Sequence, residues 1–273
     1  MPPARPDLKD ELVFLETLAD AARPLALRHF RTGIMSESKS AGPDAEYDPV
    51  TAADREVEAR LRALIAQHRP GDGVLGEEQA ATPSATGRTF IIDPIDGTRA
   101  FIAGLPTWCV LIAVSGPGGP VASVIDQPFT GERFLGLTGQ TAWLDRGLGR
   151  QPIRTRGRAV SRIEDAIIST TDPGLFGGAE AGAFAALASR ARVRRFGLDA
   201  YGYAALALGG IDLVVESGLK AWDVAALIPV VTGAGGVMTD WRGGACHEGG
   251  QVVAAANAEL HALALEHLSP AAA

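Results

Sequence analysis

Two aspartates, Asp93 and Asp96, follow an apolar run in the stretch FIIDPIDGT, residues 90–98. The apolar run predicts a buried strand that ends at Asp93, because Pro94 has no backbone donor for a ladder hydrogen bond. The turn after Pro94 can direct the carbonyl of Ile95 outward and bring Asp96 back beside Asp93. Two carboxylates and a carbonyl are hard oxygen ligands of the kind that Mg²⁺ prefers. The stretch therefore predicts a metal site.

The same stretch ends in Gly97 and Thr98. Gly97 lets the backbone pass close to a ligand, because it has no Cβ. Thr98 begins TRAFIAG, which predicts a helical turn whose free N–H groups suit a phosphate. The alternative is that Asp-Gly closes a β-hairpin. The full pattern favours a site for a metal and a phosphate over a plain turn.

Four other acidic residues have ordinary structural explanations when taken alone. LGEE places Glu77 and Glu78 after a short strand, where a solvated charged turn is the alternative. AWDVAALIPVV places Asp223 at the start of an apolar helix, where N-capping is the ordinary role. Asp54 lies in the first turn of another helix, whose dipole it would stabilise.

Taken together, the acidic side chains point to cations. Two carboxylates about 4 Å apart repel each other by roughly 4 kcal/mol at an effective dielectric of 20. A cluster of Glu77, Asp93, Asp96 and Asp223 is therefore costly unless cations lie among the carboxylates. Two Mg²⁺ ions would make the cluster favourable, and they could clamp the attacking and leaving oxygens of a phosphoryl displacement.

The first half of the chain must position most of these residues. Apolar periodicity predicts a helix over 8–30 and another that begins at a Thr51 cap and ends near residue 67. The polar stretch 36–49 predicts a loop. Strands are expected at 73–78, 88–93, 108–116, 120–128, 131–139 and 141–147.

After about residue 155 strands and helices follow one another. Strands are expected at 165–171, 193–197, 211–217, 237–244 and 251–256, and helices at 179–191, 200–209, 222–236 and 258–268. The pattern predicts an α/β protein with α+β layering rather than strict βαβ alternation. We expect two lobes, residues 1–155 and 156–273, that share an interface.

The bulk composition excludes several classes of protein. The chain of 273 residues has a net charge of −7, which argues against a nucleic-acid binder, and the basic stretch SRARVRR (189–195) is interpreted as a solvated helix end. Two cysteines are too few for a disulfide framework or a zinc cluster. The N-terminal stretch shows no secretory signal, and no run approaches the roughly 20 apolar residues of a membrane span. We therefore expect a cytoplasmic protein with no membrane partner.

The motifs GEE, DPIDGT and WDVAA, in this order, resemble the inositol monophosphatase superfamily of Mg²⁺-dependent, lithium-sensitive phosphatases, and so does DPVTAAD upstream. The resemblance covers roughly residues 10–265. It implies a layered α/β/α/β/α sandwich of the inositol monophosphatase and fructose-1,6-bisphosphatase type, and a homodimer. It also implies a small-molecule phosphate ester as substrate and two or three Mg²⁺ ions.

The resemblance assigns the metal ligands. Glu77, Asp93 and the carbonyl of Ile95 would hold the first metal. Asp93, Asp96 and Asp223 would hold the second metal.

The resemblance also assigns catalytic and phosphate-binding roles. Gly97 and Thr98 would contact the phosphate through backbone N–H groups. The Thr98 hydroxyl and Asp54 would orient the attacking water near the first metal, with Glu77 in the same catalytic group. Asp223 would border the substrate as well as the metal.

The stretch RRFGLDAYGYAALALGGIDLVVESGLKAWDVAALIPVVTGAGGVMTDWRGG (194–244) resembles the histidinol-phosphate phosphatase branch of this superfamily. FRTG (30–33), DGTRAFIAGLPTW (96–108) and VIDQPFTGERFLG (124–136) resemble it too. The branch hydrolyses L-histidinol phosphate to L-histidinol and phosphate in histidine biosynthesis. A broad inositol-phosphate or sugar-phosphate monoesterase is the alternative, and a binding protein for RNA-associated machinery, supported only by RVRR, is a third hypothesis.

Asp199 and Glu216 are the expected substrate-selecting residues. Histidinol carries an ammonium and an imidazole, and carboxylates bind such donors through charge-assisted hydrogen bonds. The alternatives are that Asp199 caps the following helix and that Glu216 ends its strand in solvent. Lys39, Trp108 and Lys220 receive no assigned role.

Overall fold

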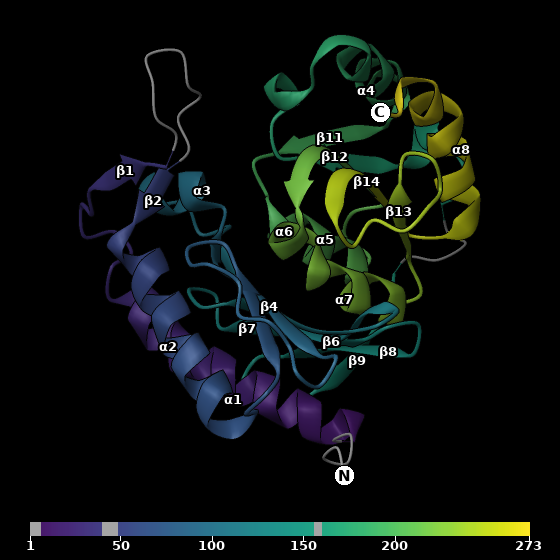
Figure 1. Cartoon of the computed structure of the whole chain (residues 1–273). Helices are drawn as coiled ribbons and strands as arrows, with labels where there is room; N and C mark the ends of the chain where they lie inside the picture. The colour runs from purple at the N-terminus through teal and green to yellow at the C-terminus, as the bar shows by residue number, and fades with distance from the viewer. Residues whose placement is uncertain (1–6, 40–48, 156–159) are drawn as a thin grey trace.

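The computed structural model describes residues 7–39, 49–155 and 160–273, and these form five layers (Figure 1). Helices cover the outer face of a seven-stranded sheet, further helices lie between it and a five-stranded sheet, and two helices cover the far side. The expected α/β/α/β/α sandwich is therefore confirmed. Within the described ranges, no helix combines the length and the apolar character that crossing a membrane requires.

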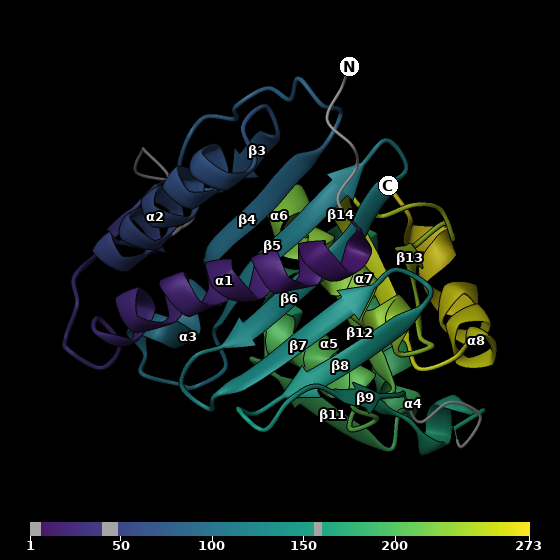
Figure 2. The same cartoon turned by 90° about the horizontal axis from the view of Figure 1, so that it is seen from below.

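The first two layers hold most of the candidate ligands. The outer helices are α1 (Leu8–Leu27) and α2 (Ala52–His68). The sheet has the order β3 (Gly73–Gly76), β4 (Thr89–Asp96), β5 (Cys109–Gly116), β6 (Gly119–Gln127), β7 (Glu132–Leu137), β8 (Thr141–Asp145) and β9 (Gln151–Ile153). Among the described strands of this sheet, β3 and β4 pair in parallel and all other neighbours are antiparallel. Leu15 and Leu18 of α1 and Leu61 and Ile65 of α2 are fully buried against this sheet, and Figure 2 shows α1 lying across its strands.

The remaining layers come from the second half of the chain. The helices between the sheets are α5 (Ala200–Ala207), α6 (Ala221–Ala225) and α7 (Leu227–Gly233). The second sheet has the order β11 (Val193–Phe196), β10 (Ile167–Thr170), β12 (Leu213–Lys220), β14 (Gly249–Ala255) and β13 (Val237–Asp240). The outermost helices are α4 (Gly178–Arg190) and α8 (Ala258–Leu268), which bury a third apolar cluster against this sheet.

The middle layer packs closely on the first sheet. Gly136 of β7 touches the backbone of Pro229 and Val230 in α7, where a Cβ would overlap backbone atoms. The Ser123 hydroxyl of β6 donates to the carbonyl of Ala226 at 2.6 Å. These contacts fix the α6–α7 segment, and with it Asp223, over the sheet.

Several sequence-based expectations were wrong in detail. The expected helix 222–236 is two short helices, because Pro229 has no N–H to donate to the carbonyl of residue 225. The expected loop 36–49 begins in β1 (Ser36–Ser38) and ends at β2 (Pro49–Thr51), which pair with each other. Residues 40–48 between them lie outside the described residues, and β9 was missed altogether.

Two other expectations concern the lobes and the basic stretch. The two sheets come from residues 73–153 and 167–255. The boundary expected at 155/156 borders residues 156–159, which lie outside the described ranges, so it stays a prediction. The stretch SRARVRR spans the end of α4 and continues into the edge strand β11, where Arg194 and Arg195 are exposed.

Candidate metal and phosphate site

Three carboxylates converge between β4 and α6. Asp93, Asp96 and Asp223 each present an oxygen, and these oxygens lie within 4.8 Å of one another. Burial, followed by the charge of neighbouring carboxylates, raises the pKa of Asp93 and of Asp96 well above the ordinary value. A compact set of carboxylate oxygens is the donor set of a hard divalent cation such as Mg²⁺. The residues therefore fit the metal site expected from the sequence.

A β-bulge presents the two aspartates of β4. Asp93 pairs with Leu111 and Asp96 pairs with Cys109, so two residues of β4, Pro94 and Ile95, lie opposite one residue of β5. The expectation that the strand ends at Asp93 was wrong, because the bulge accommodates Pro94 and pairing resumes at Asp96. The bulge turns both carboxylates toward the same space.

Polar groups in and next to the bulge form hydrogen bonds with one another. The N–H of Ile95 donates to Asp93 Oδ1 at 3.0 Å, and the Thr98 hydroxyl donates to the carbonyl of Ile95 at 3.0 Å. A carbonyl oxygen has a second lone pair, so this contact leaves Ile95 able to bind a cation.

Asp223 combines the two roles that the sequence left open. It is the third residue of α6, and its Oδ2 accepts from the backbone N–H of Lys220 at 2.6 Å. The same carboxylate belongs to the acidic cluster with Asp93 and Asp96. Stabilising the helix start thus fixes the side chain where a ligand is needed.

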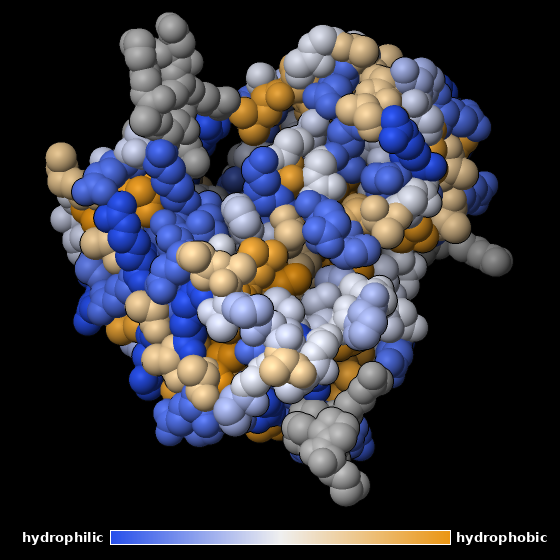
Figure 3. Space-filling view, viewed as in Figure 1, coloured by the Kyte–Doolittle hydropathy of each residue, from blue (hydrophilic) through white to orange (hydrophobic). Residues whose placement is uncertain are grey.

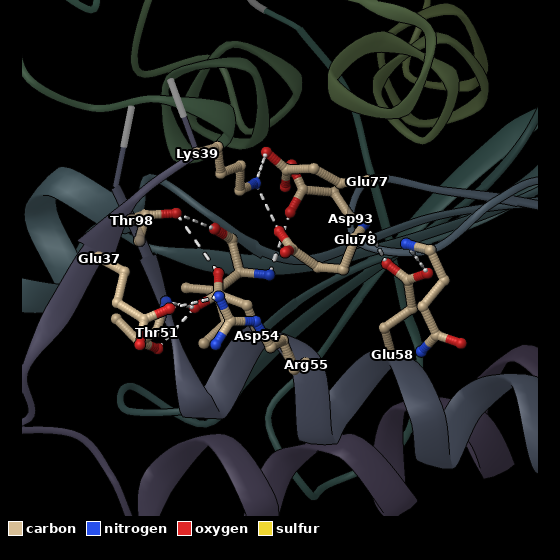
Figure 4. A network of polar contacts seen from close by, with 12 residues as sticks. Glu37, Lys39, Thr51, Asp54, Arg55, Glu58, Glu77, Glu78, Asp93 and Thr98 are labelled. Carbon is tan, nitrogen blue, oxygen red and sulfur yellow. Dashed lines mark hydrogen bonds and ion pairs between the residues drawn. The ribbon is translucent and has the colours of Figure 1, made fainter. Parts of the chain in front are cut away.

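Glu77 follows β3, and its side chain lies near Asp93 of the cluster (Figure 4). Burial raises the pKa of Glu77 to about 7, and the charges of Asp223 and Glu78 act in the same direction. Lys39 Nζ lies 2.7 Å from Glu77 Oε1 and 2.5 Å from Glu78 Oε1. Although burial would lower the pKa of Lys39, these two hydrogen bonds raise it above the ordinary value. The Lys39 ammonium is therefore a counter-charge for Glu77 in this structure.

Asp54 points from the first turn of α2 toward the same space (Figure 4). Its Oδ2 accepts from the backbone N–H of Thr51 at 2.8 Å and from the Thr51 hydroxyl at 2.5 Å. Its Oδ1 lies 3.5 Å from the Thr98 hydroxyl. Burial raises the pKa of Asp54, although the bonds from Thr51 oppose this shift. A helix cap thus holds Asp54 with one oxygen facing Thr98.

Gly97 links the cluster to the short helix α3 (Thr98–Ile102). Its φ is +79°, in the left-handed region that favours glycine. A Cβ at Gly97 would also lie 3.1 Å from the Asp199 carboxylate. The alternative that Asp-Gly closes a hairpin is wrong, because Gly97 begins a helix that leads away from β4.

A cleft of about 240 Å³ connects the acidic cluster to the second half of the chain. In the space-filling view the surface is hollowed between α3 and the α6–β12 side (Figure 3). The predicted residues that line the cleft are Asp96, Gly97, Thr98, Asp199, Glu216 and Asp223. Sequence reasoning missed Arg99, Thr171 and Tyr203, which line it too. Only Arg99 carried a signal, its position directly after Thr98.

Asp199 is held in a strained conformation at the edge of this cleft. Its φ is +48°, although it is not glycine, and its side chain makes no capping hydrogen bond to α5. The alternative that Asp199 caps the helix is therefore wrong. Burial raises the pKa of Asp199 to about 6, and the charge of Arg99 opposes this shift. Strain of this kind concentrates at functional sites.

Glu216 is buried, with 4% of its surface exposed, so the alternative that it ends its strand in solvent is wrong. The strand β12 continues to Lys220 and bulges after Glu216. The carboxylate accepts from the N–H of Thr171 at 2.7 Å and from the hydroxyls of Thr171 and Thr170 at 3.0 and 3.1 Å. Burial outweighs these bonds and raises the pKa of Glu216 to about 7.

Trp108 and Lys220 are not among the residues that line the cleft. Trp108 is fully buried, with its ring centroid 4.9 Å from Phe101 and 5.3 Å from Phe30, so it packs in the core. Lys220 precedes α6 and donates its backbone N–H to Asp223, which leaves the role of its side chain open.

Comparisons with known proteins agree over nearly the whole chain. A family model described as the inositol monophosphatase family matches residues 7–272. A histidinol-phosphatase of Mycobacterium tuberculosis is 37% identical and is matched over 95% of this chain and 98% of that protein. An inositol-1-monophosphatase of Caulobacter vibrioides is 33% identical, over 94% and 100%. A solved structure of an inositol monophosphatase from Zymomonas mobilis is 36% identical, with a TM-score of 0.82 over 97% and 100%.

Proposed function

Because the chain belongs to the inositol monophosphatase family of metal-dependent phosphatases, we propose that it hydrolyses L-histidinol phosphate to L-histidinol and phosphate, with Mg²⁺ as cofactor. Its similarity to a histidinol-phosphatase over almost the full length of both proteins supports this substrate. The matched residues include the full acidic cluster and the cleft beside it.

The observation that carries the proposal is the pair of carboxylates beyond the metal cluster. Asp199 and Glu216 line the same cleft as Asp96 and Asp223. Glu216 already accepts hydrogen bonds from Thr170 and Thr171, but these donors are uncharged, and a cation compensates a buried carboxylate more strongly. The ammonium of histidinol is such a cation and its imidazole is a further donor, whereas the hydroxyl groups of an inositol carry no charge.

We assign the metal ligands to the carboxylates of the acidic cluster, Glu77 and the Ile95 carbonyl. Glu77, Asp93 and the Ile95 carbonyl would hold one Mg²⁺, and Asp93, Asp96 and Asp223 another. When bound, the ions would neutralise the charge of the phosphoryl group and lower the pKa of water.

Other groups would orient the reactants. The N–H groups of Gly97 and Thr98 would bind phosphate oxygens, because they open the helix α3. The Thr98 hydroxyl donates to the Ile95 carbonyl, so its oxygen can accept a hydrogen bond from water. Asp54 Oδ1 lies 3.5 Å from that hydroxyl and would hold and accept the water proton.

Hydrolysis of inositol 1-phosphate is the second candidate. It is favoured by the inositol-1-monophosphatase of Caulobacter vibrioides, whose identity to this chain is only slightly lower. Phosphate release from histidinol phosphate, inositol 1-phosphate and a bisphosphorylated nucleotide, each with Mg²⁺, separates the candidates. Release from inositol 1-phosphate without release from histidinol phosphate would replace the first proposal with the second.

Replacing Asp199 with asparagine tests the substrate assignment. The change removes the charge and leaves the shape, so we expect KM for histidinol phosphate to rise ~10–100-fold. This corresponds to the roughly 1.5–3 kcal/mol of a charge-assisted hydrogen bond. The kcat/KM for inositol 1-phosphate should change little. Exposed Asp165, replaced in the same way, is the control, and an unchanged KM for histidinol phosphate in Asp199→Asn would contradict the assignment.

Two properties implied by the resemblance and composition remain proposals. We propose a homodimer, which sedimentation equilibrium of the purified chain would test, and a cytoplasmic location, which fractionation of the source cells would test.

A further inference from the structure

Glu58 is a buried carboxylate of α2 that the proposed mechanism does not use. It lies one helical turn after Asp54, on the same face of the helix, and none of its surface is exposed. Its Oε2 accepts from the backbone N–H of Glu78 at 2.7 Å, and its Oε1 accepts from the N–H of Gln79 at 3.0 Å (Figure 4). Both oxygens therefore bind the backbone directly after Glu77.

Arg62 completes the arrangement one turn further along α2. Its Nε donates to Glu58 Oε1 at 2.7 Å, and its NH2 group donates to the carbonyl of Gln79 at 3.0 Å. Arg62 thus compensates the charge of buried Glu58. It also holds the segment after Glu77 a second time, through the carbonyl of Gln79. An exposed pair of this spacing contributes little to stability, but here Glu58 is wholly buried and also binds backbone N–H groups.

Gly76 fits the segment to the same carboxylate. A Cβ at this position would overlap the Glu58 carboxylate, so only glycine allows the backbone to pass so close. Gly76 is also the last residue of β3, where it pairs with Ile92 of β4. The backbone of Glu77 is therefore fixed by strand pairing on one side and by Glu58 on the other.

This double attachment matters because β3 is short. It has four residues and lies at the edge of the sheet, so strand pairing alone is a weak support for a residue beyond its end. From these contacts we infer that Glu58 is a positioning residue for Glu77 and sets its carboxylate in place for the divalent ion. The inference rests on the proposed role of Glu77 as a ligand of the first metal.

The test is direct metal binding to protein stripped with EDTA, measured by calorimetric titration with Mg²⁺ and with Mn²⁺. Glu58→Gln replaces one acceptor oxygen with an amide donor, which would face a backbone N–H. We expect the Kd of the metal site that includes Glu77 to rise ~10–100-fold, the usual effect of losing a group that supports a ligand. Glu58→Asp, which keeps the charge but shortens the reach, should raise it too. The control is Glu56→Gln, which removes a carboxylate from the partly exposed side of the same helix.

Kinetics distinguish positioning from a general loss of structure. In both Glu58 variants the Mg²⁺ concentration for half-maximal rate should rise, while KM for the phosphate ester and kcat at saturating Mg²⁺ stay close to wild type. A lowered melting temperature with an unchanged Kd for both ions would overturn the inference and leave Glu58 as a stabilising residue. If wild-type protein itself bound neither ion, the proposed metal site would fail, and the inference would fall with it.

Discussion

Asparagine in place of Asp93 is expected to lower kcat/KM by ~10³-fold while making the metal-free protein more stable. Asp93 is 3% exposed and belongs to both proposed metal sites, so its loss removes about 4 kcal/mol of charge stabilisation in the transition state. Without metal the same carboxylate is repelled by Glu77, Asp96 and Asp223. Asparagine keeps an acceptor for the N–H of Ile95 and removes the repulsion, so the free energy of unfolding in EDTA should rise by ~1–3 kcal/mol.

Thermal unfolding with EDTA and with Mg²⁺ measures the expected change in stability. Wild-type protein should gain stability from Mg²⁺, because an ion that binds only the folded state stabilises it, and Asp93→Asn should gain little. Asp212→Asn is the matched control, since Asp212 is another buried aspartate, bound to the N–H of Ile167 outside the cluster. A metal-free Asp93→Asn protein less stable than wild type would mean that the carboxylates do not repel one another.

Asparagine in place of Asp54 is expected to lower kcat by ~10²–10³-fold and to leave metal binding intact. The amide oxygen can still accept from the N–H of Thr51, so the start of α2 should survive. The charge that would hold and accept the proton of the attacking water is lost, and such groups contribute about 10²–10⁴-fold. Steady-state kinetics at saturating Mg²⁺ measure the loss.

Two comparisons make the Asp54 prediction specific. The stabilisation by Mg²⁺ should equal that of wild type, because Asp54 is not a proposed ligand. Glu56→Gln, on the same helix, should keep full activity. A kcat within about threefold of wild type in Asp54→Asn would remove Asp54 from the catalytic group.

The sequence predicted the layers and most of the elements for identifiable physical reasons. The spacing of Leu15, Leu18, Leu61 and Ile65 marks one buried face on each of α1 and α2. The two sheets followed from short apolar runs separated by turn residues. The β-bulge at Pro94 could not be predicted, because it depends on pairing with β5, which follows later in the chain. The break before Pro229 was missed, although its cause, the missing N–H of proline, is in the sequence.

The convergence of the acidic residues was predictable because strand ends and helix starts are strongly marked in the sequence. Asp93 and Asp96 follow an apolar strand, and Asp223 begins an apolar helix. The sequence around each residue therefore places it at the end of an element, without knowledge of its neighbours in space. Their roles as ligands remain proposals, whereas their proximity is a feature of the fold.

Other parts of the site had no signal of this kind. Glu58 and Lys39 are ordinary charged residues in the sequence, and only the fold brings them to Glu77 and the segment after it. For Glu216 solvent exposure stayed open as the alternative, because a strand end cannot be told from a bulge without the opposite strand, β14. Contacts between residues far apart in the chain therefore determine which residues hold the ligands in place and which compensate their charge.

Anomalous diffraction from crystals soaked in Mn²⁺, a substitute for Mg²⁺, tests most directly whether the carboxylates gather around divalent ions. The prediction is at least one strong anomalous peak within bonding distance of carboxylate oxygens of Asp93, Asp96 and Asp223, and a further peak between Asp93 and Glu77 with the Lys39 ammonium displaced. Crystals that hold Mn²⁺ only elsewhere, with Lys39 still on Glu77 and no peak among the three aspartates, would contradict it.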